Sequence, residues 1–203
     1  MKNILIVFTK NPEEGKVKTR LGRSIGFKNA RLICMDLMKS IHDAVIDLPY
    51  HKKVSYSGYI DRQDLWDSEK FEKSVQSGED IGQRMHNEFV NAFNNGFARA
   101  VLIGSDIIGL TPEIVKDAFT QLSQADLVLG PAMDGGYYLI GMKQPNRELF
   151  LNIDWGTKTV LDQTLSLCDR VNLTCSLLTE LSDLDTVDDL QYLPDEFHKK
   201  YKG

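Results

Sequence analysis

Residues Asn3 to Arg20 read NILIVFTKNPEEGKVKTR, and this stretch decides the fold class. Its first part, Asn3 to Phe8, is a short apolar and β-branched run without polar alternation, which is typical of a strand buried on both faces. A loop rich in Lys, Gly and Arg follows directly. Because ligands of open α/β sheets bind beyond the carboxyl ends of the strands, this order predicts a ligand site in the loop.

The rest of the chain alternates the two patterns. Apolar residues recur every three or four positions, as on one helix face, in Phe27 to Leu48, Ile81 to Phe93, Thr111 to Leu122 and Lys158 to Asp169. Short apolar runs predict strands at Lys53 to Tyr59, Ala100 to Ile103, Asp126 to Leu129, Tyr137 to Met142 and Val171 to Leu178. We predict a loop with a short helix for Asp61 to Gly78, and a last short helix capped by Thr186. The expected fold is a single α/β domain over residues 1–203, with a mostly parallel central sheet and helices on both faces.

Composition excludes several classes of protein. The 203 residues include 24 Lys and Arg against 29 Asp and Glu, a net charge of −5, which argues against a general nucleic-acid binder. The apolar run Ile4 to Phe8 is too short to cross a membrane or form a signal-peptide core. Three cysteines without a CxxC pair indicate a reduced, cytoplasmic chain, with Cys34 and Cys168 as small core residues.

The charge is unevenly distributed. Lys10 to Arg31 holds seven basic and two acidic residues, whereas Glu180 to Glu196 holds seven acidic residues and no Lys or Arg. These segments could form two halves of one anion-and-metal site, or be unrelated surface features, and charge alone leaves both open. Within the acidic segment we assign Asp188 and Asp189 to a helix start, and Asp195 and Glu196 to a solvated tail.

The basic loop predicts a phosphate site. Gly15 allows a close backbone approach, and Lys10, Lys18 and Arg20 supply cations that suit a di- or triphosphate. The loop is not a P-loop, which needs Gly where Lys10 stands, and it is not a dinucleotide fingerprint. The alternative is a merely solvated basic loop.

Two further motifs carry candidate acids. Asp106 follows a buried strand, where a carboxylate could hold a divalent metal over phosphates or, alternatively, serve as a turn or helix-cap residue. Asp134 precedes Gly135 and Gly136, whose freedom from side chains leaves room for a bulky ligand, although a plain β-turn explains the same residues. Asp183 and Asp185 alternate as on an extended segment. We expect Asp185 to make a second metal or acceptor contact, with Asp183 ranked after it. Asp80 could cap the helix after it, and Arg84 could face either solvent or an anion.

Together these motifs resemble the bacterial DUF2064 family of GT-A-like nucleotide-diphospho-sugar transferases, which is related to arsenosugar-synthesis glycosyltransferases and, more distantly, to cofactor guanylyltransferases. Six ordered motifs carry the resemblance: Phe8 to Leu21, Gln76 to Met85, Gly104 to Leu110, Gly130 to Gly141, Trp155-Gly156-Thr157 and Asp183 to Leu190. The chain departs from the family pattern at Ile108, where the family has Pro, and at Gly109, where an acid is often found.

The resemblance implies a Rossmann-like GT-A fold, Asp106 as a metal-binding acid, and Lys18 and Arg20 as phosphate-loop cations. We therefore expect a Mg²⁺- or Mn²⁺-dependent transferase, with Asp106 and Asp185 on the metal and Asp134 as general base or ligand contact. The expected partners are a nucleotide sugar and a small-molecule acceptor, without nucleic acid or membrane. Two alternatives stay open: a nucleotidyltransferase that releases pyrophosphate from an NTP, and an inert nucleotide-binding protein, which the departure at Ile107-Ile108-Gly109 motivates.

Overall fold

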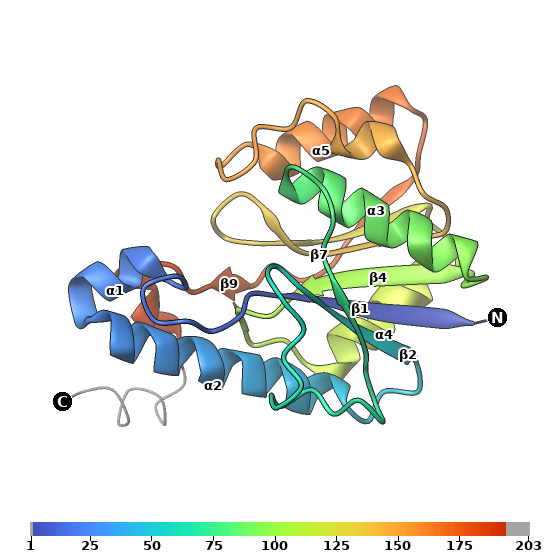
Figure 1. Ribbon diagram of the computed structural model, residues 1–203. Helices are drawn as coiled ribbons and strands as arrows, with labels where there is room; N and C mark the ends of the chain where they lie inside the picture. Colours follow the sequence, from blue (N-terminus) through green and yellow to red (C-terminus); the bar gives the residue numbers. More distant parts are fainter. Residues whose placement is uncertain (1, 194–203) are drawn as a thin grey trace.

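The computed structural model describes residues 2–193, which form a central sheet with helices on both sides (Figure 1). The strand order is β3-β2-β1-β4-β7-β6-β8, and all neighbours are parallel except those of β7. The strands are β1 (Asn3–Thr9), β2 (His51–Tyr56), β3 (Glu72–Val75), β4 (Arg99–Gly104), β6 (Leu127–Pro131), β7 (Tyr137–Met142) and β8 (Cys175–Leu177). This confirms the α/β class and the mostly parallel sheet.

Each face of the sheet is covered by its own pair of long helices, as Figure 1 shows. The helices are α1 (Thr19–Ile25), α2 (Phe27–Val45), α3 (Ile81–Asn94), α4 (Pro112–Gln121) and α5 (Val160–Arg170), with 3-10 turns η1 (Arg147–Phe150) and η2 (Asp188–Tyr192). Side chains of α2 and α4 pack with one set of strand residues, and those of α3 and α5 pack with the other. Alternate residues of the central strands therefore point into two separate cores, which explains why these strands are apolar throughout.

Two helix starts follow the predicted capping chemistry. The Thr111 side chain accepts a hydrogen bond from the Ile114 amide, with Pro112 in the first turn of α4. The Asp80 carboxylate accepts one from the Gln83 amide at the start of α3. Both helices thus begin where the sequence places them.

A second, two-stranded sheet joins β5 (Ile107–Ile108) to β9 (Ser182–Asp183). Its antiparallel register pairs Ile107 with Asp183 and Ile108 with Ser182. Ile107 and Ile108 are both buried and form strand β5. The departure from the family pattern at Ile108 thus lies within a small strand. The ladder ties the acidic segment near the end of the chain to the residues directly after β4.

The structure corrects four local predictions. The basic loop contains helix α1, and the segment predicted as loop with a short helix contains edge strand β3. Strand β8 is shorter than predicted because only Cys175–Leu177 pairs with β6. Thr186 does not cap η2: its hydroxyl and amide both donate to the Asp189 carboxylate instead. Asp195 and Glu196, predicted as a solvated tail, lie outside the described residues.

Candidate functional site

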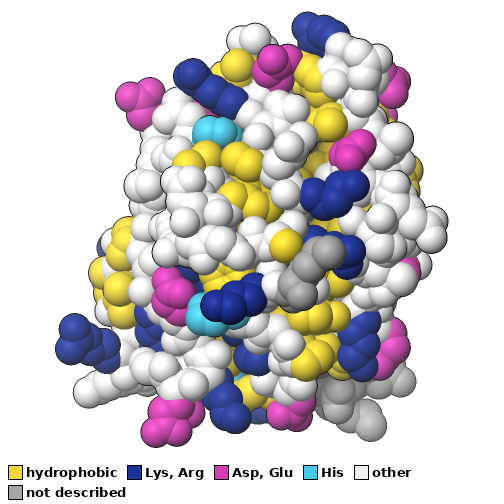
Figure 2. All heavy atoms as spheres, turned by 90° about the vertical axis from the view of Figure 1, so that its right-hand side faces the viewer, with side chains coloured by type: hydrophobic (Ala, Val, Ile, Leu, Met, Phe, Trp, Pro, Cys, Tyr) yellow, Lys and Arg dark blue, Asp and Glu magenta, His cyan; other side chains and the backbone are white. Residues whose placement is uncertain are grey.

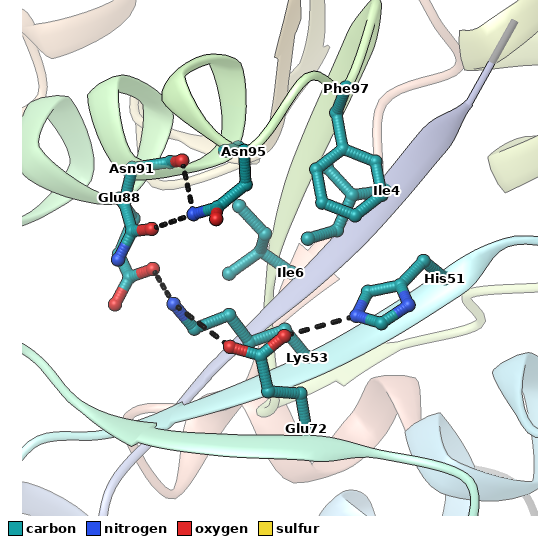
Figure 3. Close-up of a pocket in the computed structure, with 10 residues that line it drawn as sticks. Ile4, Ile6, His51, Lys53, Glu72, Glu88, Asn91, Asn95 and Phe97 are labelled. Atoms are coloured by element: carbon teal, nitrogen blue, oxygen red, sulfur yellow. Dashed lines mark hydrogen bonds and ion pairs between the residues drawn. The ribbon is translucent and has the colours of Figure 1, made fainter.

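Hollows lie at the amino ends and at the carboxyl ends of the strands of the sheet, and we take the one at the amino ends first. It measures about 250 Å³ and is lined by Lys53, Glu72, Glu88, His51 and residues of α3 (Figure 3). Lys53 is buried and lies 2.7 Å from Glu88 Oε2 and 3.9 Å from Glu72 Oε1. Figure 2 looks onto this end of the molecule, where positive and negative side chains are interspersed.

The charges of this hollow are already compensated. Glu88 Oε1 accepts hydrogen bonds from Ser55 and Ser74, at 2.7 and 3.2 Å, while Oε2 of the same carboxylate pairs with Lys53. The network fills a polar stretch of sheet that α3 covers, and buried charges need such partners. We therefore assign this hollow to fold stability and look for the functional site at the carboxyl ends of the strands.

At the carboxyl ends lies a hollow of about 310 Å³, which we call the basic pocket. Its charged lining residues are Lys10, Lys16, Lys18, Arg84, Asp106 and Asp185. They come from the loops after β1 and β4, from the start of α3 and from the segment after β9. The structure thus brings Lys10, Lys18, Asp106 and Asp185 together, as the sequence predicted, although they are far apart in the chain.

Lys18 and Asp106 form the centre of the basic pocket. Lys18 Nζ lies 2.7 Å from Asp106 Oδ2, and the Lys18 side chain is 7% exposed, whereas that of Asp106 is 45% exposed. Burial disfavours the charged amine, but the Asp106 carboxylate outweighs it and holds the pKa of Lys18 above its ordinary value. Burial likewise opposes ionisation of Asp106, and Lys18 more than offsets it, so the pKa of Asp106 is lowered. Each group thus favours the charged form of the other, and the Asp106 side chain remains partly exposed in the lining of the pocket.

The backbone of Lys18 is also unusual. Its φ of +46° lies in the left-handed region, which costs about 1–2 kcal/mol for a residue with a side chain. Lys18 occupies the cap position of α1 without a side-chain capping bond, since a charged amine has no acceptor for a backbone amide. Its amine pairs with Asp106. Backbone strain of this kind is concentrated at functional sites.

Two predicted phosphate-site residues lie at the margin. Arg20 Nη1 lies 2.8 Å from Asp185 Oδ2, with the Arg20 side chain 70% exposed, so its charge is shared with that acid. Gly15 has a φ of +76° and no atom within 4 Å of the place where a side chain would begin. Neither residue lines the basic pocket, so their predicted contact with phosphates stays a prediction.

Arg84 is the cation that sequence reasoning left open between solvent and an anion. The structure places it on the basic pocket, with Nε donating to the Gly78 carbonyl oxygen at 3.1 Å. This bond leaves the other guanidinium nitrogens available. The sequence holds an indication of this position of Arg84. Asp80 caps α3, and Arg84 lies one turn further along that helix.

A hollow of about 230 Å³, which we call the acidic pocket, adjoins the basic pocket and shares Ile81, Gly104 and Asp106 with it. Its lining includes three carboxylates, those of Asp106, Asp134 and Asp183. Among the described residues that line it, none is Lys or Arg. The two pockets therefore meet at Asp106 with opposite charge on either side.

Asp183 is the acid that the sequence ranked below Asp185. Pairing of β9 with β5 brings it to the acidic pocket, facing Asp106 and Asp134. Partial burial first, and the charge of Asp134 second, raise the pKa of Asp183 to about 6. Only the long-range ladder reveals this position, because the alternation of Asp183 and Asp185 along the chain does not distinguish them.

The Asp134 turn is built by its two glycines. Gly135 has a φ of +88°, and a side chain there would meet the Lys158 carbonyl oxygen at 2.2 Å. The close approach that the sequence assigned to a ligand is thus made by the Lys158 backbone. Gly136 donates its amide to Asp134 Oδ1 at 2.8 Å and itself lines the acidic pocket. Asp134 is exposed on the pocket rim with one oxygen fixed by this turn.

Trp155 forms an aromatic wall of the acidic pocket together with Tyr137. Their ring centroids lie 6.4 Å apart at an interplanar angle of 83°, an edge-to-face contact. A side chain at Gly82 would lie 2.6 Å from Trp155 Cζ2, so α3 holds the indole closely. In the sequence Trp155 stands out only as part of a family motif, and the structure places it in the wall of the acidic pocket.

The carboxylates of the site bear on whether it can hold a divalent metal. Within residues 2–193, no three His, Cys, Asp or Glu side chains form a ready cluster for a metal ion. Mg²⁺, however, is commonly bound by one or two carboxylates, with substrate phosphates and water completing its octahedron. Asp106 and Asp183 line one pocket beside a basic hollow, and the charge of Asp106 contributes to the raised pKa of Asp183. This donor set fits a metal that arrives with a phosphorylated substrate.

Solved structures place this geometry among known folds. A protein of Desulfovibrio desulfuricans G20, which carries the provisional name nucleotide-diphospho-sugar transferase, is 33% identical, with a TM-score of 0.87, and the match covers 94% of this chain and 85% of that one. The inositol-1-phosphate CTP transferase of T. maritima is 14% identical, with a TM-score of 0.57, over 99% and 96% of the two chains. The glucosyl-3-phosphoglycerate synthase of Mycobacterium tuberculosis, in complex with Mg²⁺ and UDP, is 14% identical with a TM-score of 0.50, over 93% and 74%.

At these low identities, the last two structures support the Rossmann-like GT-A fold alone. A search of curated proteins finds no match. The family model described as "Uncharacterized protein conserved in bacteria (DUF2064)" matches residues 42–157. That range includes Arg84, Asp106 and Asp134, and the Desulfovibrio relative extends the likeness over nearly the whole chain. The chain belongs to the DUF2064 family.

Proposed function

We propose that this protein is a metal-dependent glycosyltransferase that takes a sugar from a nucleotide-diphospho-sugar, with residues 1–203 acting as one catalytic domain. The observation that carries the proposal is the meeting of a basic and an acidic pocket at Asp106. The basic side of this division of charge suits the diphosphate of such a donor, and the acidic side offers carboxylates for a metal and for an acceptor proton. The provisional name of the Desulfovibrio relative and the UDP in the mycobacterial synthase support the same class of donor.

The basic pocket would bind the diphosphate. Lys10 and Arg84 are partly free to bind phosphate oxygens, and Lys18 is held in place by its pair with Asp106. Charge-assisted hydrogen bonds from such cations are stronger than neutral ones. They also stabilise the charge that develops on the leaving diphosphate, which lowers the barrier to transfer.

Asp106 and Asp183 would hold Mg²⁺ or Mn²⁺, and Asp185, which lines the basic pocket together with Asp106, is the further candidate ligand. When bound, such a metal supplies positive charge that neutralises the diphosphate leaving group. The Lys18 amine already balances Asp106 in the structure, so this carboxylate is kept ionised and ready to coordinate.

The transfer itself needs a base for the acceptor. The acceptor oxygen forms a bond to the anomeric carbon of the sugar, and the bond from that carbon to the diphosphate oxygen breaks. The bonding pair stays on the nucleoside diphosphate, and the acceptor proton moves to a carboxylate. We assign that role to Asp134, which is exposed on the acidic pocket and oriented by the Gly136 amide.

A nucleotidyltransferase is the second candidate, because the basic pocket suits a triphosphate equally well and the T. maritima CTP transferase shares the fold. It differs in the bond broken, since attack on the α-phosphate of an NTP releases pyrophosphate. An inert nucleotide-binding protein is the third. It would bind nucleotide without turning over any donor.

A two-step experiment separates the three. Thermal-shift measurements with nucleotides and nucleotide sugars, with and without Mn²⁺, identify the preferred base, because a ligand of the folded state raises the melting temperature. The purified protein is then incubated with the stabilising nucleotide sugar or NTP. Release of nucleoside diphosphate supports the proposal, pyrophosphate supports the second candidate, and stabilisation without either product supports the third.

A further inference from the structure

We infer that the acidic pocket binds the acceptor, and that this acceptor is an uncharged or cationic compound bearing hydroxyl groups, not a phosphorylated or carboxylated one. The inference rests on the proposed function, since an acceptor exists only if the protein transfers a group from a phosphorylated donor. It goes further by assigning the chemical class of the second substrate to one hollow of the molecule.

The charge of the pocket carries the first step. Asp106, Asp134 and Asp183 line it, whereas the four Lys and Arg side chains of the site line the basic pocket, where Lys18 balances Asp106. A divalent metal on Asp106 and Asp183 would still leave the Asp134 charge uncompensated. Like charges a few ångströms apart repel most strongly where water is partly excluded. A phosphate or carboxylate on the acceptor would therefore weaken binding in this hollow.

The walls of the pocket carry the second step. Trp155 and Tyr137 provide aromatic surface, and Met85 and Val160 add apolar surface beside it. Small-molecule sites typically combine such walls with a few well-placed polar groups. Here those groups are the three carboxylates and the Thr157 hydroxyl, and an ionised carboxylate can only accept hydrogen bonds. A compound with several hydroxyl donors and an apolar face suits this lining.

The position of the pocket carries the third step. Because it shares Ile81, Gly104 and Asp106 with the basic pocket, a molecule in it faces a donor whose diphosphate occupies the other side. Asp134 lies on the acidic side, where it can take the proton of an acceptor hydroxyl. The acceptor oxygen then joins the sugar as the nucleoside diphosphate leaves with the bonding pair.

The chain offers a direct binding readout. It has two tryptophans, and Trp66 is fully buried among residues of the α2 and α4 core, away from both pockets. The variant Trp66→Phe leaves Trp155 as the single fluorophore. With the preferred nucleotide and Mg²⁺ present, it is titrated with glucose, glucosamine and glucose 6-phosphate, a series of matched size and changing charge. If Trp66→Phe fails to fold, calorimetric titration of the natural chain measures the same order of affinities.

We expect quenching of Trp155 fluorescence by glucose and glucosamine, with glucose 6-phosphate binding at least about tenfold more weakly than glucose. In the background of Trp66→Phe, Asp134→Asn reduces the difference in affinity between glucose and glucose 6-phosphate, because it removes one repelling charge with little change of shape. Asp162→Asn is the matched control, since Asp162 is exposed at the start of the nearby α5 and does not line the pocket. This control variant leaves the difference in affinity between the two sugars unchanged.

The outcomes separate the two proposals. If no nucleotide stabilises the protein with or without metal, the proposed function fails. If nucleotide binds but glucose 6-phosphate quenches as strongly as glucose, or none of the three probes quenches, the inference on the acceptor is overturned while the donor site stands. If Asp134→Asn leaves the difference in affinity between glucose and glucose 6-phosphate unchanged, the inference on the acceptor is also overturned. The phosphate would then be excluded by its size and not by its charge.

Discussion

Lys18 Nζ lies 2.7 Å from Asp106 Oδ2, and this contact joins two loops separated by 88 positions in the chain. The buried amine keeps the carboxylate ionised, and the carboxylate keeps the amine charged. The Asp106 carboxylate stays partly accessible, since its side chain is 45% exposed, whereas the Lys18 side chain is 7% exposed. The pair therefore places a partly accessible carboxylate beside a buried positive charge at the junction of the two pockets, an arrangement that suits the proposed metal and donor diphosphate.

Replacing Lys18 by Met keeps the buried stem and removes the charge. We expect the affinity for the preferred nucleotide to fall at least about tenfold, because a hydrogen bond to a charged group contributes about 1.5–3 kcal/mol. Calorimetric titration measures the change. Lys28→Met, on the exposed side of α2 and outside the pocket, is the control. Equal affinities of the two variants would remove Lys18 from the nucleotide site.

Gly15 and Gly135 both have left-handed backbone, so alanine substitutions at these positions distinguish the cost of backbone strain from the cost of a steric clash. Gly15→Ala introduces a side chain into open space at φ +76°, and we expect it to lower the free energy of unfolding by about 1–2 kcal/mol. Gly135→Ala has a similar φ of +88° but meets the Lys158 carbonyl oxygen at 2.2 Å, so we expect a further loss of about 1–3 kcal/mol. Urea unfolding of both variants measures this difference. Equal losses in the free energy of unfolding would mean that the turn at Asp134 shifts to accommodate the new side chain without further cost.

Asp126 gives a prediction on pH. Hydrogen bonds from Thr174, with the nearby Lys143, lower the pKa of Asp126 from 3.8 to about 2. A lowered pKa stabilises the fold fully above the ordinary pKa, and this contribution is lost as the pH falls from about 4 toward 2. The stability difference between the natural chain and Asp126→Asn should thus be largest near neutral pH and shrink in acid. Urea unfolding across this range measures it, and a difference independent of pH would contradict the assignment.

The central strands could be predicted because they are buried on both faces. The runs Asn3 to Phe8 and Ala100 to Ile103 are apolar throughout, and β1 and β4 contain them. Edge strand β3 was missed, since Glu72 and Lys73 are polar neighbours and the strand has one partner only. Helix α1 was missed because seven residues are too few to show a helical period.

The site could be predicted in part, for a similar reason. Lys18 and Asp106 each follow a strand, so the carboxyl-end rule was enough to bring them together. The place of Asp183 depends on the two-residue ladder between β5 and β9, and the walls at Trp155 depend on its packing against Gly82. Such contacts between distant segments leave no periodic signal in the chain. None of the helices in the described part of the protein is long and apolar enough to span a membrane.

The most direct test of the account is the rate of nucleoside diphosphate release from the preferred nucleotide sugar by the natural chain and by Asp106→Asn, in Mn²⁺ and after chelation. We predict that chelation abolishes the rate of the natural chain and that Asp106→Asn lowers it at least about 100-fold in Mn²⁺, the loss expected when a group that stabilises developing charge is removed. Asp188→Asn, an exposed acid outside both pockets, should keep the natural rate. Turnover by Asp106→Asn at the natural rate in Mn²⁺ would contradict the account.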